Sequence, residues 1–231
     1  MIYIRSIFFY LGAAFSTIPF LIISLLVLPL PPTTRSKLIT GWAVFATWWL
    51  KICCGLSHRL ENKENIPDTP CVFACNHQST WEAIATQTFL PPLAWVLKKE
   101  LFNIPIFGWG LWATRPIAID RNDRITALDQ VTNQGKDKLA EGRYVLIFPE
   151  GTRTEYGGDA RYRKGASRLA RSANVSLVPI AHNAGKYWSQ SSLWIKPGVI
   201  KCIIGPKITL ADKRDRDVTA ELKQWITSQG L

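Results

Sequence analysis

Short apolar runs alternate with helical patterns along most of the chain, and this alternation constrains the fold more than any other feature. The apolar runs at 71–75, 94–97, 116–119, 144–148, 176–181 and 199–205 have the length and composition of strands. Helical patterns cover residues 80–89, 124–141, 164–173 and 217–228. Such alternation is typical of a parallel sheet covered by helices. We therefore predict an α/β fold with a mostly parallel central sheet flanked by helices.

The amino-terminal part of the chain is apolar enough to enter a membrane. Residues 7–30 contain no charged residue and are long enough to span a bilayer, and a second apolar stretch at 38–50 is rich in Trp. A cleaved signal peptide is the alternative, but the run is long, the amino end carries only Arg5, and no convincing small-residue cleavage site follows. Pro19 and the prolines at 29–32 bend or end helices. We predict a two-helix hydrophobic membrane anchor over residues 1–60, spanning the bilayer or lying in one leaflet, and an α/β domain over 61–231.

The chain is strongly basic, with 28 Lys and Arg against 17 Asp and Glu and a net charge of +11. This charge suits anionic membrane lipid, an acidic carrier protein or nucleic acid. A basic cluster at residues 161–171 could contact phosphate backbones, but no recognised nucleic-acid motif accompanies it, so no specific nucleic acid is expected. The five cysteines form no C-x-x-C pair and no zinc spacing, which favours a reduced cytoplasmic setting and no metal site.

The stretch "NHQSTWE" follows the predicted strand at 71–75 and contains His77 and Glu82. A neutral imidazole can take a proton from an alcohol near neutral pH, and a carboxylate on its other nitrogen would fix the tautomer. On one regular helix the two side chains would point about 140° apart. They can meet if His77 lies in the loop and Glu82 in the first turn of the next helix. Alternatively, Ser79 to Glu82 form a capping box.

The stretch "FPEGTRT" follows the predicted strand at 144–148. Gly151 allows close backbone approach, Arg153 can bind a phosphate, and Glu150 and Thr152 add polar groups. The alternative is a tight turn with a surface ion pair. Arg121, just beyond another strand, is a further candidate phosphate ligand. Ligand sites in parallel sheets gather at the carboxyl ends of the strands, so we expect both stretches at one edge.

Taken together, these stretches resemble the sequence blocks of the glycerolipid acyltransferase family, especially its bacterial 1-acylglycerol-3-phosphate acyltransferases. The block N-H-x-x-x-x-D is matched by Asn76, His77 and Glu82, with Glu in place of Asp. A second block resembles "PIAIDR", ending at Arg121. The block F-P-E-G-T/S-R is complete at 148–153, and a V-P-I strand follows at 178–180.

The resemblance implies direct acyl transfer from acyl-CoA or an acyl carrier protein to the free sn-2 hydroxyl of lysophosphatidic acid, giving phosphatidic acid. It makes His77 the general base and Glu82 its orienting partner. It assigns the phosphate of the acceptor to Arg121 and Arg153, in a pocket shaped by Glu150, Gly151 and Thr152. It implies no metal and no bound cofactor. With the apolar amino end, it places the protein in the bacterial inner membrane with its active site facing the cytoplasm.

Other functions remain open from the sequence. The acceptor could be glycerol-3-phosphate, another lysophospholipid or a lyso-ornithine lipid. A serine hydrolase is disfavoured because no G-x-S-x-G elbow occurs. A non-enzymatic alternative is a basic membrane-surface or nucleic-acid-binding protein. Residues 186–194 are a candidate rim for an acyl-chain tunnel.

Overall fold

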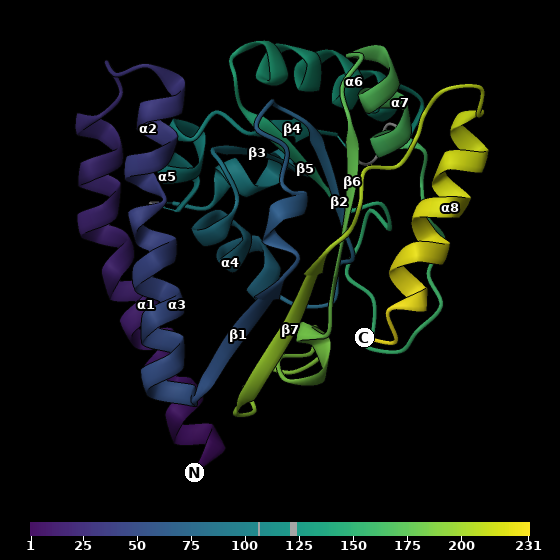
Figure 1. Cartoon of the computed structure of the whole chain (residues 1–231). Coiled ribbons are helices and arrows are strands. Elements are labelled where there is room, and N and C mark those ends of the chain that lie inside the picture. The colour runs from purple at the N-terminus through teal and green to yellow at the C-terminus, as the bar shows by residue number, and fades with distance from the viewer. Residues whose placement is uncertain (106, 121–123) are drawn as a thin grey trace.

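The molecule is built around a central sheet (Figure 1). The structure is a computed structural model, which describes residues 1–105, 107–120 and 124–231. In this described part, seven strands follow the spatial order β1-β7-β6-β2-β5-β3-β4. All neighbouring strands are parallel except β6 and β7. The strands are β1 (Leu56–Glu61), β2 (Val72–Cys75), β3 (Leu93–Lys98), β4 (Ile117–Ile119), β5 (Tyr144–Ile147), β6 (Leu177–His182) and β7 (Gly198–Ile204). The predicted α/β fold with a mostly parallel sheet is therefore confirmed.

Helices cover both faces of this sheet because its buried strands are apolar on both sides. On β2, Phe73 packs into one apolar cluster with Trp81 of α4, and Val72 packs into the other with Leu169 and Leu222 of α7 and α8. The helices after β1 are α4 (Trp81–Phe89), α5 (Phe107–Ala113), α6 (Arg124–Ala140), α7 (Gly165–Ser172) and α8 (Asp215–Ser228). Six predicted strands and four predicted helices are found within a few residues, whereas β1 and α5 are additional to the prediction.

The amino-terminal segment forms α1 (Ile2–Leu26), α2 (Pro32–Ile39) and α3 (Gly41–Cys54). α1 passes through Pro19 without ending, and Pro32 begins α2. α1 is long and apolar enough to cross a membrane, and most of it is exposed on the protein. It is the one described helix that meets this length and hydropathy criterion, since α3 has only 14 residues. α1 packs along α3, and the predicted boundary at residue 60 falls inside β1.

Candidate active site

Two loops meet at the carboxyl edge of the sheet because β2 and β5 are parallel neighbours. The loop after β2 carries His77, and the loop after β5 carries Glu150. The backbone N–H of His77 donates to Oε1 of Glu150 at 3.1 Å. Thr154 donates to the His77 carbonyl through its N–H at 2.8 Å and its hydroxyl at 3.1 Å. The expected meeting of the two motifs at one edge is thus confirmed.

His77 and Glu82 are in direct contact. Nδ1 of His77 lies 2.7 Å from Oε1 of Glu82, with His77 in the loop and Glu82 in the first turn of α4. A carboxylate in this position accepts the Nδ1 proton, which leaves Nε2 of the imidazole as the acceptor. The His77 ring also stacks on Phe148, with centroids 4.0 Å apart. The ring is therefore held from two sides while its side chain keeps 12% exposure.

The Glu82 carboxylate has a second, structural task. The same Oε1 accepts the backbone N–H groups of Gln78 and Ser79, each at 2.8 Å. The Glu82 carboxylate therefore does both things that were considered as alternatives: it accepts backbone N–H groups at the start of α4, and it pairs with His77. Burial opposes ionisation of Glu82, but the imidazole of His182 and the hydrogen bond from His77 outweigh it, so the pKa of Glu82 lies below its ordinary value. The buried group is a carboxylate that can stabilise an imidazolium.

A buried pair behind the dyad, His182 and Asn76, was not predicted to have a role. Asn76 exchanges side-chain hydrogen bonds with the backbone of His182 at 2.9 and 3.0 Å. Nδ1 of His182 accepts the N–H of Ala184, so its Nε2 proton donates to the Asn76 carbonyl at 2.8 Å. Burial lowers the pKa of His182, although the nearby Glu82 carboxylate opposes this shift. The pair fixes the turn that presents His77; its sequence signal is the Asn preceding His77.

Glu150 is buried where the two loops join. Burial raises the pKa of its carboxyl to about 7, against the hydrogen bonds that lower it. Among the residues that the structure describes, its Oε2 has no hydrogen-bond partner. Gly151 follows with φ of +75°, and a Cβ there would lie 3.0 Å from Nε of Arg163. The loop therefore needs Gly at this position both for its backbone conformation and for the close approach of Arg163.

Of the remaining predicted site residues, two lie in the loop after β5 and one lies outside the described residues. Thr152 and Arg153 lie in the same loop as Glu150 and are exposed. Arg121 lies outside the described residues. Arg115, another arginine near that strand, precedes β4 at the opposite edge of the sheet and pairs with Glu141 at 2.8 Å. The structure thus brings His77, Glu82 and the 150–153 loop together.

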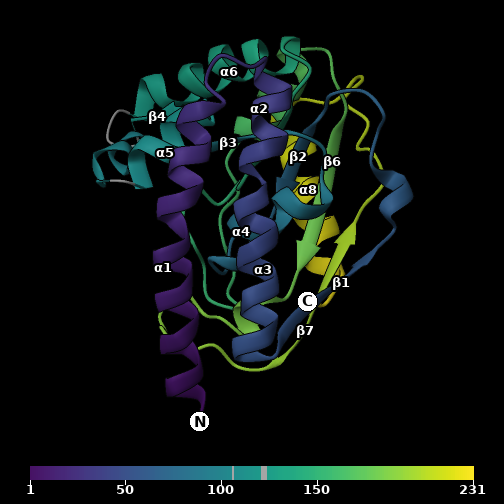
Figure 2. The same cartoon turned by 90° about the vertical axis from the view of Figure 1, so that its left-hand side faces the viewer.

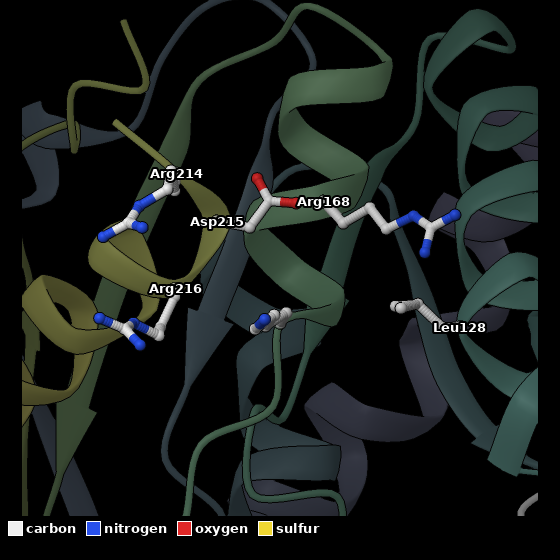
Figure 3. Close-up of a pocket in the computed structure, with 6 residues that line it drawn as sticks. Leu128, Arg168, Arg214, Asp215 and Arg216 are labelled. Atoms are coloured by element: carbon white, nitrogen blue, oxygen red, sulfur yellow. The ribbon is translucent and has the colours of Figure 1, made fainter. Parts of the chain in front are cut away.

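A basic hollow of about 530 Å³ lies elsewhere, between α6, α7 and α8 (Figure 3). It is lined by Leu128, Lys164, Arg168, Arg214, Asp215 and Arg216. Arg168 pairs with Asp129 at 2.8 Å, and Arg214 pairs with Asp217 at 3.0 Å. The Arg168 pair neutralises part of the basic cluster noted at residues 161–171. The hollow contains none of the predicted site residues.

The chemistry that this edge of the sheet supports is general-base catalysis. The imidazole has a buried carboxylate on one nitrogen, and its other nitrogen has no hydrogen-bond partner among the described residues. The thiol of Cys75, two residues before His77, is buried, and burial raises its pKa well above the ordinary value, which disfavours a thiolate nucleophile. Within the described residues, no cluster of His, Cys, Asp and Glu could hold a metal ion. The base is therefore suited to activating a hydroxyl group brought by a substrate.

A family model described as acyltransferase matches residues 57–183, which is more than half of the chain and includes both site loops. The chain belongs to this acyltransferase family, as its sequence blocks predicted.

Among characterised relatives, the 1-acyl-sn-glycerol-3-phosphate acyltransferase of Pseudomonas aeruginosa is 41% identical over 97% of this chain and 89% of its own length. The enzyme of the same name from Salmonella typhimurium is 32% identical over 57% of this chain and 52% of its own. The crystal structure of the 1-acyl-sn-glycerophosphate (LPA) acyltransferase PlsC from Thermotoga maritima superposes with a TM-score of 0.80. It covers 98% of this chain and 93% of its own, at 19% identity, and so supports the fold.

Proposed function

We propose that this protein transfers a fatty acyl chain from acyl-CoA or an acyl carrier protein to the sn-2 hydroxyl of 1-acylglycerol-3-phosphate, giving phosphatidic acid. The Pseudomonas aeruginosa relative, which aligns over nearly the whole chain, supports this activity through its name. The observation that carries the mechanism is the 2.7 Å contact between His77 Nδ1 and the buried Glu82 carboxylate.

In the proposed reaction, Nε2 of His77 takes the proton of the acceptor hydroxyl as its oxygen attacks the thioester carbonyl. Glu82 stabilises the imidazolium that forms. Collapse of the tetrahedral intermediate breaks the C–S bond, and the imidazolium returns its proton to the leaving thiolate. The products are the new ester and a free thiol, and His77 is again neutral. No acyl-enzyme forms.

The loop after β5 is the proposed phosphate site. Arg153 is exposed in this loop and can bind the acceptor phosphate, together with Arg121. Glu150, Gly151 and Thr152 shape the pocket. Because burial raises the pKa of Glu150 to about 7, part of the population is protonated at neutral pH, which reduces its repulsion of a phosphate.

The proposed membrane association involves two helices. α1 is apolar and mostly exposed, and α3 exposes the large side chains Val44, Trp48 and Ile52 along one side. We propose that α1 and α3 together anchor residues 1–60 in the inner membrane, where anionic lipid would attract the basic chain. Residues 61–231 would then form the acyltransferase domain, which faces the cytoplasm in this proposal. The relative from Pseudomonas aeruginosa supports a bacterial setting, and the exposed apolar α1 supports association with a membrane.

The test is thioester consumption by purified, detergent-solubilised protein. Lysophosphatidic acid and a matched monoacylglycerol without phosphate serve as acceptors, with acyl-CoA and acyl carrier protein as donors. We expect turnover with the phosphate-bearing acceptor only, and its loss in His77→Ala without loss of folding. His58→Gln is the matched control, since that ring packs against Trp81 and Phe89 rather than Glu82. Full activity of His77→Ala would exclude the proposed base, and turnover of the monoacylglycerol would reassign the acceptor.

A further inference from the structure

The helix α5 exposes two large aromatic side chains on the surface of the protein. Trp109 is 57% exposed and Trp112 is 60% exposed. Residues three apart lie on the same side of a helix, so the two indoles form one patch. Ile104, in the turn before the helix, is also exposed at 45%. A pair of exposed Trp residues is costly in water and indicates a surface that is covered when the protein works.

The helix that carries this patch packs against the amino-terminal helices. α1 packs between α3 and α5, and Figure 2 shows the three helices side by side on the face turned toward the viewer. Gly110 of α5 lies against Leu21 and Ser24 of α1, where a Cβ would stand 3.8 Å from both side chains. Ser24 is buried at this contact. α5 therefore lies directly beside the helix that is proposed to enter the membrane.

The charge of this face favours lipid as its occupant. Residues 1–60 contain no Asp or Glu, and α5 has the uncharged sequence "FGWGLWA". Exposed Lys37 and Lys51 add positive charge nearby. Anionic headgroups meet no opposing carboxylate on these helices, and the headgroup boundary is where Trp is preferred in membrane proteins.

We propose that α5 is a third membrane-contacting element, whose Trp109 and Trp112 insert at the headgroup boundary beside α1. The three helices then contact the membrane along a line rather than at one point. This fixes the rotation of the α/β domain about α1. The inference rests on the proposed anchoring by α1 and α3, and the experiment separates the two.

The test places one environment-sensitive fluorophore on an introduced cysteine in the full-length chain. Trp112→Cys reports on α5, and Phe15→Cys reports on α1, where Phe15 is 71% exposed. Ala220→Cys is the control on exposed α8, which lies across the sheet from α1 in Figure 1. The unsubstituted chain measures labelling of the native cysteines. Vesicles of phosphatidylethanolamine and phosphatidylglycerol carry a nitroxide on the lipid, and iodide is the aqueous quencher.

We expect the labels at 15 and 112 to be quenched by the lipid nitroxide and the label at 220 to be quenched by iodide alone. If the lipid nitroxide quenches the label at 15 while only iodide quenches the label at 112, the proposed role of α5 is overturned and the anchoring by α1 stands. Shielding of 112 from both quenchers would assign the patch to a protein partner or a second copy, and would also overturn it. Absence of lipid quenching at both positions would remove the anchoring on which the inference rests.

A functional measurement complements the labels. The double variant Trp109→Ser, Trp112→Ser changes only exposed side chains on α5 and should keep its folding and its turnover of a short-chain acceptor dissolved in water. We expect a loss of turnover with long-chain acceptor presented in vesicles. Equal loss on both acceptors would mean that the two Trp residues support the fold or the site, and unchanged turnover on vesicles would contradict the proposal.

Discussion

One oxygen of Glu82 holds together the loop that carries His77. Glu82→Gln should keep part of this capping, because an amide oxygen still accepts N–H groups. The amide cannot stabilise an imidazolium by charge, so we expect kcat to fall by about 10²–10⁴-fold. Glu82→Asp keeps the charge but withdraws the carboxylate by one methylene, and its loss should be smaller. Thioester turnover with thermal unfolding measures both effects; a fully active Glu82→Gln enzyme would contradict the dyad.

Glu150 gives the folded protein a pH dependence of known sign. Its folded pKa of about 7 lies above that of an exposed glutamic acid, so the folded state binds the proton more tightly than the unfolded chain. The resulting stability is present at low pH and is lost as pH rises through about 7. The difference between this folded pKa and the pKa of an exposed glutamic acid corresponds to about 3 kcal/mol in the free energy of unfolding.

Glu150→Gln should remove this decline. We expect the free energy of unfolding of the parent protein to fall between mildly acidic and neutral pH, with a flatter profile for the variant. Denaturant unfolding in detergent at several pH values measures it. Parallel profiles for the two proteins would show that the Glu150 carboxyl is not responsible.

At the scale of elements, α6 and α7 cross at a glycine. A Cβ at Gly135 would lie 2.5 Å from Cδ2 of Leu169, which is fully buried in the apolar cluster. Gly135→Ala should therefore lower the free energy of unfolding by about 1–3 kcal/mol, although Ala is the better helix former. Asn133→Ala on the exposed side of α6 is the matched control and should be neutral or slightly stabilising. Equal stabilisation by both changes would show that the helices move apart freely.

The elements that could be predicted are those with a strong apolar pattern. β2 and β5 are buried on both faces and read as continuous apolar runs, and their parallel pairing explains why both motifs reach one edge. β1 was missed because "LSHRLE" is an edge strand with polar side chains, and its place depends on β7 far along the chain. α5 was missed because seven residues with two Gly carry little helical signal.

The site was partly predictable for a similar reason. His77, Glu82 and Glu150 lie in short stretches next to predictable strands. His182 and Asn76 meet only through the pairing of β2 with β6, which no local pattern contains.

At the scale of the whole molecule, the anchor segment is part of the fold. Phe9 and Leu50 belong to the apolar cluster that includes Trp81. The Ser6 hydroxyl accepts the N–H of Ile195, and the Tyr10 hydroxyl donates to the Leu193 carbonyl. Removing residues 1–60 would take away these contacts and most of β1, so we expect such a deletion to unfold the domain rather than release it.

A gentler change should separate membrane binding from folding. Phe15, Ile18 and Ile22 of α1 are at least half exposed, and their replacement by Ser leaves the core intact. Each lost apolar side chain should weaken lipid binding by up to roughly 1.5–3 kcal/mol. Sedimentation with liposomes measures the bound fraction, with Ala220→Ser and Gln224→Ser on α8 as the control. Unchanged binding by the triple variant would argue against α1 as the anchor.

β1 lies at the edge of the described sheet, and its neighbour β7 comes after most of the chain has been made. On the ribosome, α1 and α3 emerge first, while the partner of β1 does not yet exist. The unpaired strand must wait through the synthesis of every other strand before its hydrogen bonds can form. An exposed strand edge invites association with other chains during this delay. Early binding of the nascent chain to the lipid bilayer would keep the unpaired β1 strands of different chains apart. Membrane insertion would then assist folding as well as determine where the protein is located.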